Sequence, residues 1–326
     1  MKATVYLPLL ALAALLCDCS SKKIEQTTST PPAHQTRFLT VADSVRLEVL
    51  DWGGTGKPLV FLTGFGNTAH VFDEFAPGFT DQYHVYAITR RGFGKSSIPR
   101  TGYDMATLAH DILVVLDSLH IPKAMMAGHS IAGDEMSRFA STYPGRVSRM
   151  VYLDAAYDRS SIMKLFAAVP VSPNPTAKDS ASRANYERYI LETVGVAMPA
   201  EELTEISVFA KNGKFLREKV PAFVFAATVP TLARPDYRHI QSPALAIYAQ
   251  HTTVQENFPY YARLDATERK QAVAGVGILQ QWAQAQPPLF RQEVAHGTAK
   301  VIKGGNHYLF ISHPKETEQL MRDFLQ

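Results

Sequence analysis

A candidate nucleophile, Ser130, lies in the segment GHSIAG at residues 128–133. The apolar run at 124–127 predicts a strand before it, and a helical pattern follows it. A serine on a tight strand-to-helix turn projects its hydroxyl above the edge of the sheet, within reach of a substrate carbonyl. The turn needs small residues two positions before and after the serine, and Gly128 and Ala132 meet that need. The pattern indicates nucleophilic catalysis, and its plainer alternative is an ordinary glycine turn before a helix.

His307 is the candidate base. A serine hydroxyl is a weak nucleophile at neutral pH and needs a base to take its proton. His307 ends the run GGNH at 304–307, which follows an apolar stretch that predicts the last strand. Parallel α/β sheets place their sites at the carboxyl ends of strands, so this loop is a suitable position for a base. His129 is adjacent to Ser130 in sequence, but the turn directs it away, and we expect it to be a packing residue.

The elements that must position these residues follow a regular pattern. Short apolar runs, such as 59–62 and 83–88, alternate with helical patterns, such as 105–119. This alternation predicts a mostly parallel sheet covered by helices on both faces. Residues from about 156 to 240 break the rhythm, and we expect them to form an inserted helical cap. Residues 266–285, in the long segment before the last strand, also show a helical pattern.

The order of the motifs resembles the α/β-hydrolase family. An oxyanion loop at 64–66, the stretch RGFGKS at 91–96 and the serine turn follow one another as they do in that family. The resemblance covers about 38–155 and 241–326. It implies an α/β-hydrolase fold with an eight-stranded type of sheet and a serine hydrolase of the AB hydrolase-1 type. Epoxide hydrolases and haloalkane dehalogenases of this family carry an aspartate where Ser130 stands, so the serine argues against both.

The catalytic acid departs from the family's commonest pattern. Most relatives carry it shortly after the strand at 243–249, where this chain has Thr252. A threonine cannot hold the imidazole tautomer as a buried carboxylate does. Other relatives place the acid directly after the strand that follows the serine turn, and Asp154 occupies that place. Asp154 is therefore the predicted acid. The weaker alternatives are Asp158, Glu256 and Asp265.

Two backbone N–H groups are expected to bind the oxygen anion that forms when Ser130 attacks a carbonyl. One belongs to Ile131, directly after the serine, and the other to Phe65, directly after Gly64. Relatives usually have a histidine before this glycine, whereas this chain has Thr63. That difference removes the family's usual support of the loop but not the N–H donors.

The motifs favour hydrolysis of a carboxylic ester or a related acyl bond through an acyl-enzyme on Ser130. Two alternatives on the same fold stay open, a prolyl-aminopeptidase-like peptidase and an acyltransferase. The peptidase would need a carboxylate in the cap to bind a substrate amine, and the candidates are Glu201, Glu202 and Glu205. A non-catalytic binding module is a further alternative, because no acid follows the strand at 243–249. Apolar cap residues are expected to roof a pocket for a small or medium ester, and the alternative is that they form the cap's own core. They are Phe166, Val169, Tyr186, Tyr189, Ile190, Phe209, Phe215, Phe223 and Phe225.

The composition excludes several other classes of function. The chain has 326 residues, of which 46% are hydrophobic and 19% charged, and its net charge of +3 is spread along the sequence. No block of lysine and arginine indicates nucleic-acid binding. Neither a phosphate-cradling glycine motif nor a metal-ligand spacing is present, so no cofactor and no metal are expected.

The N-terminus is predicted to be a targeting segment. A basic residue and a short apolar stretch precede Cys17 and Cys19, as in a secretory signal. Residues 1–19 also resemble the end of a bacterial lipoprotein signal, in which a lipidated Cys17 or Cys19 would tether the protein to a membrane. Residues 20–37, rich in Ser, Thr and Pro, are expected to link it to a domain at 38–326. We therefore expect an exported protein, which is lipid-anchored or periplasmic in a bacterial envelope, or secreted.

Overall fold

A computed structural model describes residues 34–326 of the chain. The predicted signal segment, Cys17, Cys19 and most of the predicted linker lie outside the described residues. Among the residues that are described, no helix is both long enough and apolar enough to cross a membrane.

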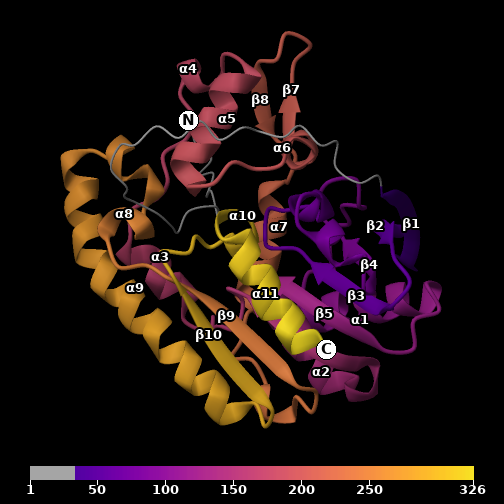
Figure 1. The fold of residues 1–326 in the computed structure, drawn as a ribbon. Coiled ribbons are helices and arrows are strands. Elements are labelled where there is room, and N and C mark those ends of the chain that lie inside the picture. The colour runs from indigo at the N-terminus through magenta and orange to yellow at the C-terminus, as the bar shows by residue number, and fades with distance from the viewer. Residues whose placement is uncertain (1–33) are drawn as a thin grey trace.

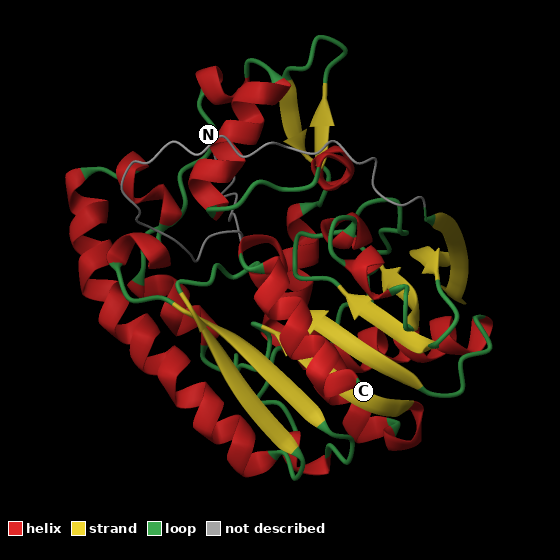
Figure 2. Ribbon diagram, in the orientation of Figure 1, coloured by secondary structure: helices red, strands yellow, loops and turns green. Residues whose placement is uncertain are grey.

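An eight-stranded sheet forms the centre of the molecule (Figures 1 and 2). Its strand order is β1-β2-β4-β3-β5-β6-β9-β10. The pairs β1–β2 and β2–β4 are antiparallel, and all other neighbours are parallel. The predicted α/β-hydrolase fold with a mostly parallel sheet is therefore confirmed. The strands are β1 (Gln35–Ala42), β2 (Val45–Gly53), β3 (Lys57–Leu62), β4 (Tyr83–Ile88), β5 (Ala124–His129), β6 (Val147–Leu153), β9 (Ala244–Gln250) and β10 (Gly297–Lys303).

The central strands are apolar at successive positions because the sheet is covered on both faces. Leu59 and Phe61 of β3 belong to one core cluster, whereas Val60 and Leu62 belong to the other. Successive side chains of a strand point to opposite faces, so each cluster receives every second residue.

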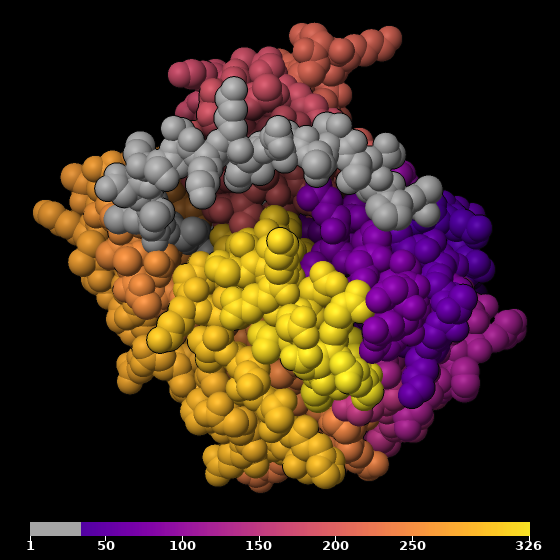
Figure 3. Space-filling view, viewed as in Figure 1, coloured from indigo at the N-terminus to yellow at the C-terminus, as the bar shows by residue number. Residues whose placement is uncertain are grey.

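Helices form the outer layers. One face of the sheet packs against α11, which the space-filling view shows between the N-terminal strands and the α9–β10 segment (Figure 3). The short helices η1 and η2 cover the same face. The opposite face packs against α1, α2 and the last turns of α9. These helices are η1 (Ala69–Phe72), η2 (Ala76–Phe79), α1 (Met105–Ser118), α2 (Ala132–Thr142), α9 (Ala266–Glu293) and α11 (Pro314–Leu325).

Short helices and a hairpin form a cap between β6 and β9, and its outer part projects from the top of the molecule in Figure 1. The sequence indicated helices only. The strands β7 and β8 are too short to show an alternating pattern, although they pair antiparallel. The elements of the cap are α3 (Ile162–Ala168), α4 (Ala177–Ser180), α5 (Arg183–Val194), α6 (Ala200–Ile206), β7 (Ser207–Phe209), β8 (Phe215–Glu218) and α7 (Ala222–Thr228).

Two boundaries differ from the sequence predictions. The first strand begins at Gln35, so the last three residues of the predicted linker, which ended at residue 37, belong to the sheet. The first three residues of this edge strand, Gln35, Thr36 and Arg37, are polar and exposed, so they carry no apolar signal, and backbone pairing with β2 holds them. The helix α9, expected to end near residue 285, continues through Pro287 and Pro288. Its last turns are anchored by Phe290, which is fully buried in the core.

We predict that Gly133→Ala destabilises the fold by about 1–3 kcal/mol, the usual cost of overpacking. A Cβ at Gly133, near the start of α2, would lie 2.1 Å from the carbonyl oxygen of Ala155, so the helix would have to move away from the end of β6. Chemical denaturation measures this change in the free energy of unfolding.

The matched control is Gly277→Ala in α9, where no atom lies within 4 Å of the added Cβ. Alanine stabilises an open helical position by about 1 kcal/mol over glycine. Equal effects of the two substitutions would contradict the close packing of α2 on β6.

Candidate active site

Ser130 lies on a strained turn between β5 and α2, as predicted. Its φ angle is 54°, in the left-handed region that residues with side chains rarely adopt. Its N–H donates to the carbonyl of Leu153 at 3.3 Å, and its own carbonyl accepts from Gly133 N–H at 3.0 Å. A Cβ added at Gly128 would lie 2.8 Å from Sδ of Met136 and 3.1 Å from the Cβ of Ala132, so the turn leaves little room for larger residues at either position.

His307 and Asp154 are brought together from the ends of two strands. Asp154 directly follows β6, and His307 lies in the loop after β10. The Nδ1 atom of His307 is 2.6 Å from Oδ2 of Asp154, which is a charge-assisted hydrogen bond. The bond places the ring proton on Nδ1 and leaves Nε2 free to accept a proton. The structure therefore pairs the predicted base with the predicted acid.

Asp154 is buried but remains charged. Burial alone would raise the pKa of this carboxyl group, but the hydrogen bond and charge of His307 lower it, and two further donors contribute. Tyr157 O–H donates to Oδ1 at 2.5 Å, and the backbone N–H of Ala249 donates to the same oxygen at 2.9 Å. The net result is a pKa below the usual value for Asp, so the carboxylate can stabilise a positively charged imidazole.

The weaker candidates for the acid have other partners. Asp158 accepts from the N–H of Ser160, and Asp265 caps the first turn of α9. Glu256 forms the capping box of α8 (Val254–Asn257) and also accepts from the side chain of Thr252 at 2.9 Å. Thr252, at the position of the family's usual acid, thus donates to the glutamate that completes the capping box of α8.

Arg90 supports the oxyanion loop in place of the missing histidine. Its guanidinium donates to the carbonyl oxygens of Thr63 at 2.7 Å and Gly64 at 3.2 Å. Glu135 of α2 holds the other edge of the same guanidinium, in a pair that is buried on both sides. Sequence reasoning missed this residue, because an arginine before the RGFGKS stretch has no signal of its own without the fold.

His129 is a packing residue, as expected. Its Nε2 contacts the backbone oxygen of His307 at 3.0 Å, and its ring lies 4.6 Å from that of Tyr308. A Cβ added at Gly64 would lie 2.6 Å from Nδ1 of His129, so the ring also packs directly on the oxyanion loop. Burial keeps the pKa of His129 well below its usual value, so the ring is neutral and Nε2–H donates.

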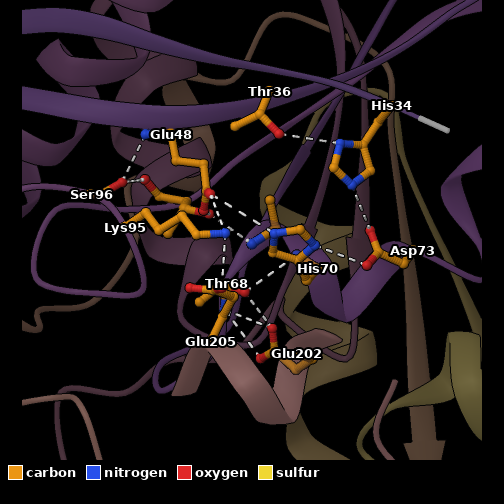
Figure 4. A network of polar contacts seen from close by, with 12 residues as sticks. His34, Thr36, Glu48, Thr68, His70, Asp73, Lys95, Ser96, Glu202 and Glu205 are labelled. Carbon is orange, nitrogen blue, oxygen red and sulfur yellow. Dashed lines mark hydrogen bonds and ion pairs between the residues drawn. The ribbon is translucent and has the colours of Figure 1, made fainter. Parts of the chain in front are cut away.

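Glu202 of the cap holds the two residues that follow the oxyanion loop, Asn67 and Thr68 (Figure 4). Its fully buried carboxylate accepts from Asn67 Nδ2 at 2.9 Å and from Thr68 N–H at 3.1 Å. Thr68 Oγ1 lies 2.5 Å from its second oxygen. The Asn67 side chain also accepts from Tyr308 O–H at 3.1 Å, so one network joins the cap, the oxyanion loop and the loop of His307. This role requires tertiary contacts that the sequence does not reveal.

A cavity of about 450 Å³ opens over the nucleophile. Ser130 and His307 line it, together with Asp154 and the two residues whose N–H groups are expected to form the oxyanion hole, Phe65 and Ile131. The structure therefore gathers all five predicted site residues at one cavity. Side chains of the cap and of α9 form much of its apolar wall, among them Phe166, Val169, Leu279 and Trp282.

Most of the predicted apolar roof has a different place. Of the nine residues, Phe166 and Val169 line the cavity. The others pack within the cap or against the main domain, as Tyr186 stacked on Phe215 shows at 3.9 Å between ring centroids. Helical and strand patterns identified apolar residues of the cap but did not show which of them form its own core. The seven residues that do not line the cavity are Tyr186, Tyr189, Ile190, Phe209, Phe215, Phe223 and Phe225.

A family model for the alpha/beta hydrolase fold matches residues 57–243, and the chain belongs to this family. A putative non-heme haloperoxidase of Mycobacterium phage D29 is 27% identical over 272 residues, which cover 80% of this chain and 94% of that protein. A non-heme chloroperoxidase of Streptomyces lividans is 37% identical over 120 residues, 36% of this chain and 44% of that protein. This chain thus spans less than half the length of the Streptomyces relative.

Solved structures share the fold. The crystal structure of E-2-(acetamidomethylene)succinate hydrolase superposes with a TM-score of 0.66 at 20% identity and covers 90% of this chain and 99% of that one. Est816, described as an N-acyl homoserine lactone degrading enzyme, superposes with a TM-score of 0.59 at 19% identity, over 88% and 100% of the two chains.

We predict that Glu202→Gln flattens the pH dependence of stability. Burial raises the pKa of Glu202 from 4.5 to about 7, although Thr68 and Asn67 donate to the carboxylate. Because the folded-state pKa lies above the unfolded-state value, this contribution to stability is fully present below pH 4.5 and is lost as the pH rises through about 7. The loss corresponds to about 3 kcal/mol. Urea titrations of both proteins from pH 4 to 8 measure it.

A glutamine can accept from Thr68 N–H and donate to its hydroxyl, so the variant is expected to fold. The control is Glu201→Gln, at the exposed neighbouring position, which should retain the wild-type pH dependence. If the free energy of unfolding depended on pH in the same way in Glu202→Gln and in the wild type, the assignment of this titration to Glu202 would be wrong.

Proposed function

We propose that this protein is a serine hydrolase that cleaves a carboxylic ester or a related acyl bond. The observation that carries the proposal is the pairing of His307 with a charged, buried Asp154 at the cavity that Ser130 also lines. This is the arrangement of groups that activates a serine for acyl transfer.

The reaction follows from the roles of these groups. Ser130 Oγ attacks the substrate carbonyl while His307 Nε2 takes its proton, and Asp154 stabilises the resulting imidazolium. The N–H groups of Phe65 and Ile131 bind the oxygen anion of the tetrahedral intermediate. His307 then protonates the leaving alcohol, and the acyl group stays on Ser130. Water, deprotonated by His307, attacks the acyl-enzyme and releases the acid.

The cavity favours a small or medium, largely apolar substrate. Its volume of about 450 Å³ lies in the range of small-molecule sites. Apolar side chains such as Phe166 and Trp282 form much of its wall. The Arg159 guanidinium also lines the cavity, but Asp134 pairs with it at 2.6 Å, so its charge is largely balanced.

The peptidase alternative loses its candidate residues. Glu201, Glu202 and Glu205 are absent from the lining of the cavity among the described residues. Glu202 is held by the oxyanion loop, and Glu205 pairs with Lys95 at 2.8 Å. None of the three is therefore available to a substrate amine at this cavity.

A haloperoxidase is the second candidate, because the phage relative is named a putative haloperoxidase and the Streptomyces relative a chloroperoxidase. In this reading, hydrogen peroxide replaces water as the acceptor of the acyl group from Ser130. The product is a peracid, which oxidises a halide ion. Assays with an ester alone, and with acetate, peroxide and bromide, separate the two activities.

A fluorophosphonate probe is expected to label Ser130, because the activated hydroxyl attacks phosphorus as it attacks a carbonyl. Peptide mass spectrometry of the labelled protein identifies the modified residue. In His307→Ala the labelling should fall by at least about 100-fold, since the base is lost. His313→Ala, which removes a nearby histidine outside the cavity, is the control and should label normally. A folded wild-type protein that remains unlabelled would overturn the proposal.

Asp154→Asn should lower kcat by about 10⁴-fold, because an amide favours the wrong imidazole tautomer. Ester hydrolysis in the steady state measures the change. Asp158→Asn is the matched control, since its carboxylate caps a local turn instead of contacting His307. A near-wild-type rate for Asp154→Asn, or a comparable loss in Asp158→Asn, would refute the role of Asp154.

A further inference from the structure

A second group of polar side chains lies near the start of the described chain (Figure 4). His34, His70 and Asp73 each offer one ligand atom, and these atoms lie within 4.8 Å of one another. None of the three residues lines the cavity of Ser130. We propose that these side chains bind a zinc ion, at a site separate from the one that carries the proposed hydrolysis.

The distances between the three side chains fit one ion after a small adjustment. His70 Nδ1 is 2.9 Å from Asp73 Oδ2, and His34 Nε2 is 3.8 Å from Asp73 Oδ1. Zinc binds nitrogen and oxygen ligands at about 2.0–2.2 Å, so neighbouring ligands of a tetrahedral ion lie about 3.4 Å apart. The two distances lie on either side of that value. The His34 side chain is 21% exposed, so it has room to rotate.

The donor set selects the kind of ion. Two imidazole nitrogens and a carboxylate oxygen are a common ligand set for zinc, with water in the fourth position. Calcium and magnesium prefer sites made entirely of oxygen atoms. The partial exposure of His34 leaves the solvent side of the cluster for the water ligand.

Unpartnered buried atoms give independent support to the site. Asp73 is 6% exposed, and its Oδ1, which faces His34, has no hydrogen-bond partner among the described residues. On the other side of His70, Nε2 lies 3.8 Å from Oε1 of Glu48, and both atoms also lack a hydrogen bond. A histidine that binds a metal usually directs its second nitrogen to a carboxylate, which fixes the ring. Glu48 is placed for that role and leaves Nδ1 of His70 for the ion.

The ion would connect two segments that are far apart in sequence. His34 directly precedes β1, whereas His70 and Asp73 belong to η1 and its end. Thr68, the residue that caps η1, is also the residue that Glu202 holds. Zinc would therefore stabilise the start of the domain against the segment that follows the oxyanion loop.

Equilibrium dialysis against zinc tests the site on the full chain, prepared without a polyhistidine tag. Cys17 and Cys19 are replaced by serine in every sample, because thiolates bind zinc strongly. We expect one zinc per chain and a higher melting temperature with zinc than without it. Cobalt in place of zinc should give the visible absorption bands of a tetrahedral site.

Two variants and a control assign the binding to these residues. His34→Ala and Asp73→Asn should each weaken zinc binding at least about ten-fold and abolish the rise in melting temperature. The control is His239→Ala, which removes an exposed histidine. His239 pairs with Asp236 at the three-residue spacing that His70 and Asp73 also have. This variant should bind zinc as the parent does. Circular dichroism verifies that each variant is folded.

Either of two results would overturn the proposal. One is the absence of stoichiometric zinc from the folded parent, which would mean that a protonated His70 simply bridges Glu48 and Asp73. The other is equal zinc binding by the parent and by His34→Ala. Fluorophosphonate labelling of Ser130 is measured on the same samples, so loss of the proposed catalytic site is distinguished from loss of the zinc site.

Discussion

The arrangement of the candidate active site depends on the buried carboxylate of Asp154. A buried charge is costly unless donors surround it, and here the donors come from separate parts of the chain. Tyr157 begins the path into the cap, Ala249 lies in β9, and His307 follows β10. The ends of the neighbouring strands β6, β9 and β10 must therefore keep fixed positions relative to one another, so that all the donors reach this carboxylate. The same contacts that lower the folding cost of this charge set the orientation of the imidazole.

A second buried carboxyl group, that of Glu202, also holds separate parts of the chain together. It joins the cap to the residues that follow the oxyanion loop. It fixes Asn67 and Thr68, while Arg90 fixes the backbone of the preceding residues of the loop. The loop and the residues after it are thus held by a carboxyl group from the cap and a guanidinium group from the main domain. Because the cap supplies one of these groups, folding of the cap and correct placement of the oxyanion loop are physically linked.

Local patterns in the sequence were sufficient to place Ser130 on a tight strand-to-helix turn and His307 in a loop after the last strand, because these are short-range features. Asp154 required an additional argument, the threonine at the usual position of the acid. Residues that act only through tertiary contacts carried no such signal, as Glu202 and Arg90 show. The same limit applies to β1, whose exposed side chains hide a strand that is specified by pairing with β2. In α9 the burial of Phe290 outweighs two prolines that would end most helices.

Because Asp154 follows β6, the proposed acid and the segment after β9 belong to different parts of the chain. The segment after β9 carries Gln250, His251 and Asn257 into the cavity wall, but it supplies none of the proposed catalytic side chains. The same segment also supports the proposed base, because His251 Nε2 donates to the carbonyl of Gly305 at 2.8 Å and the carbonyl of Gln250 accepts from Gly304 N–H at 3.0 Å. A change of substrate made through this segment would therefore have to preserve the two bonds that hold the loop of His307.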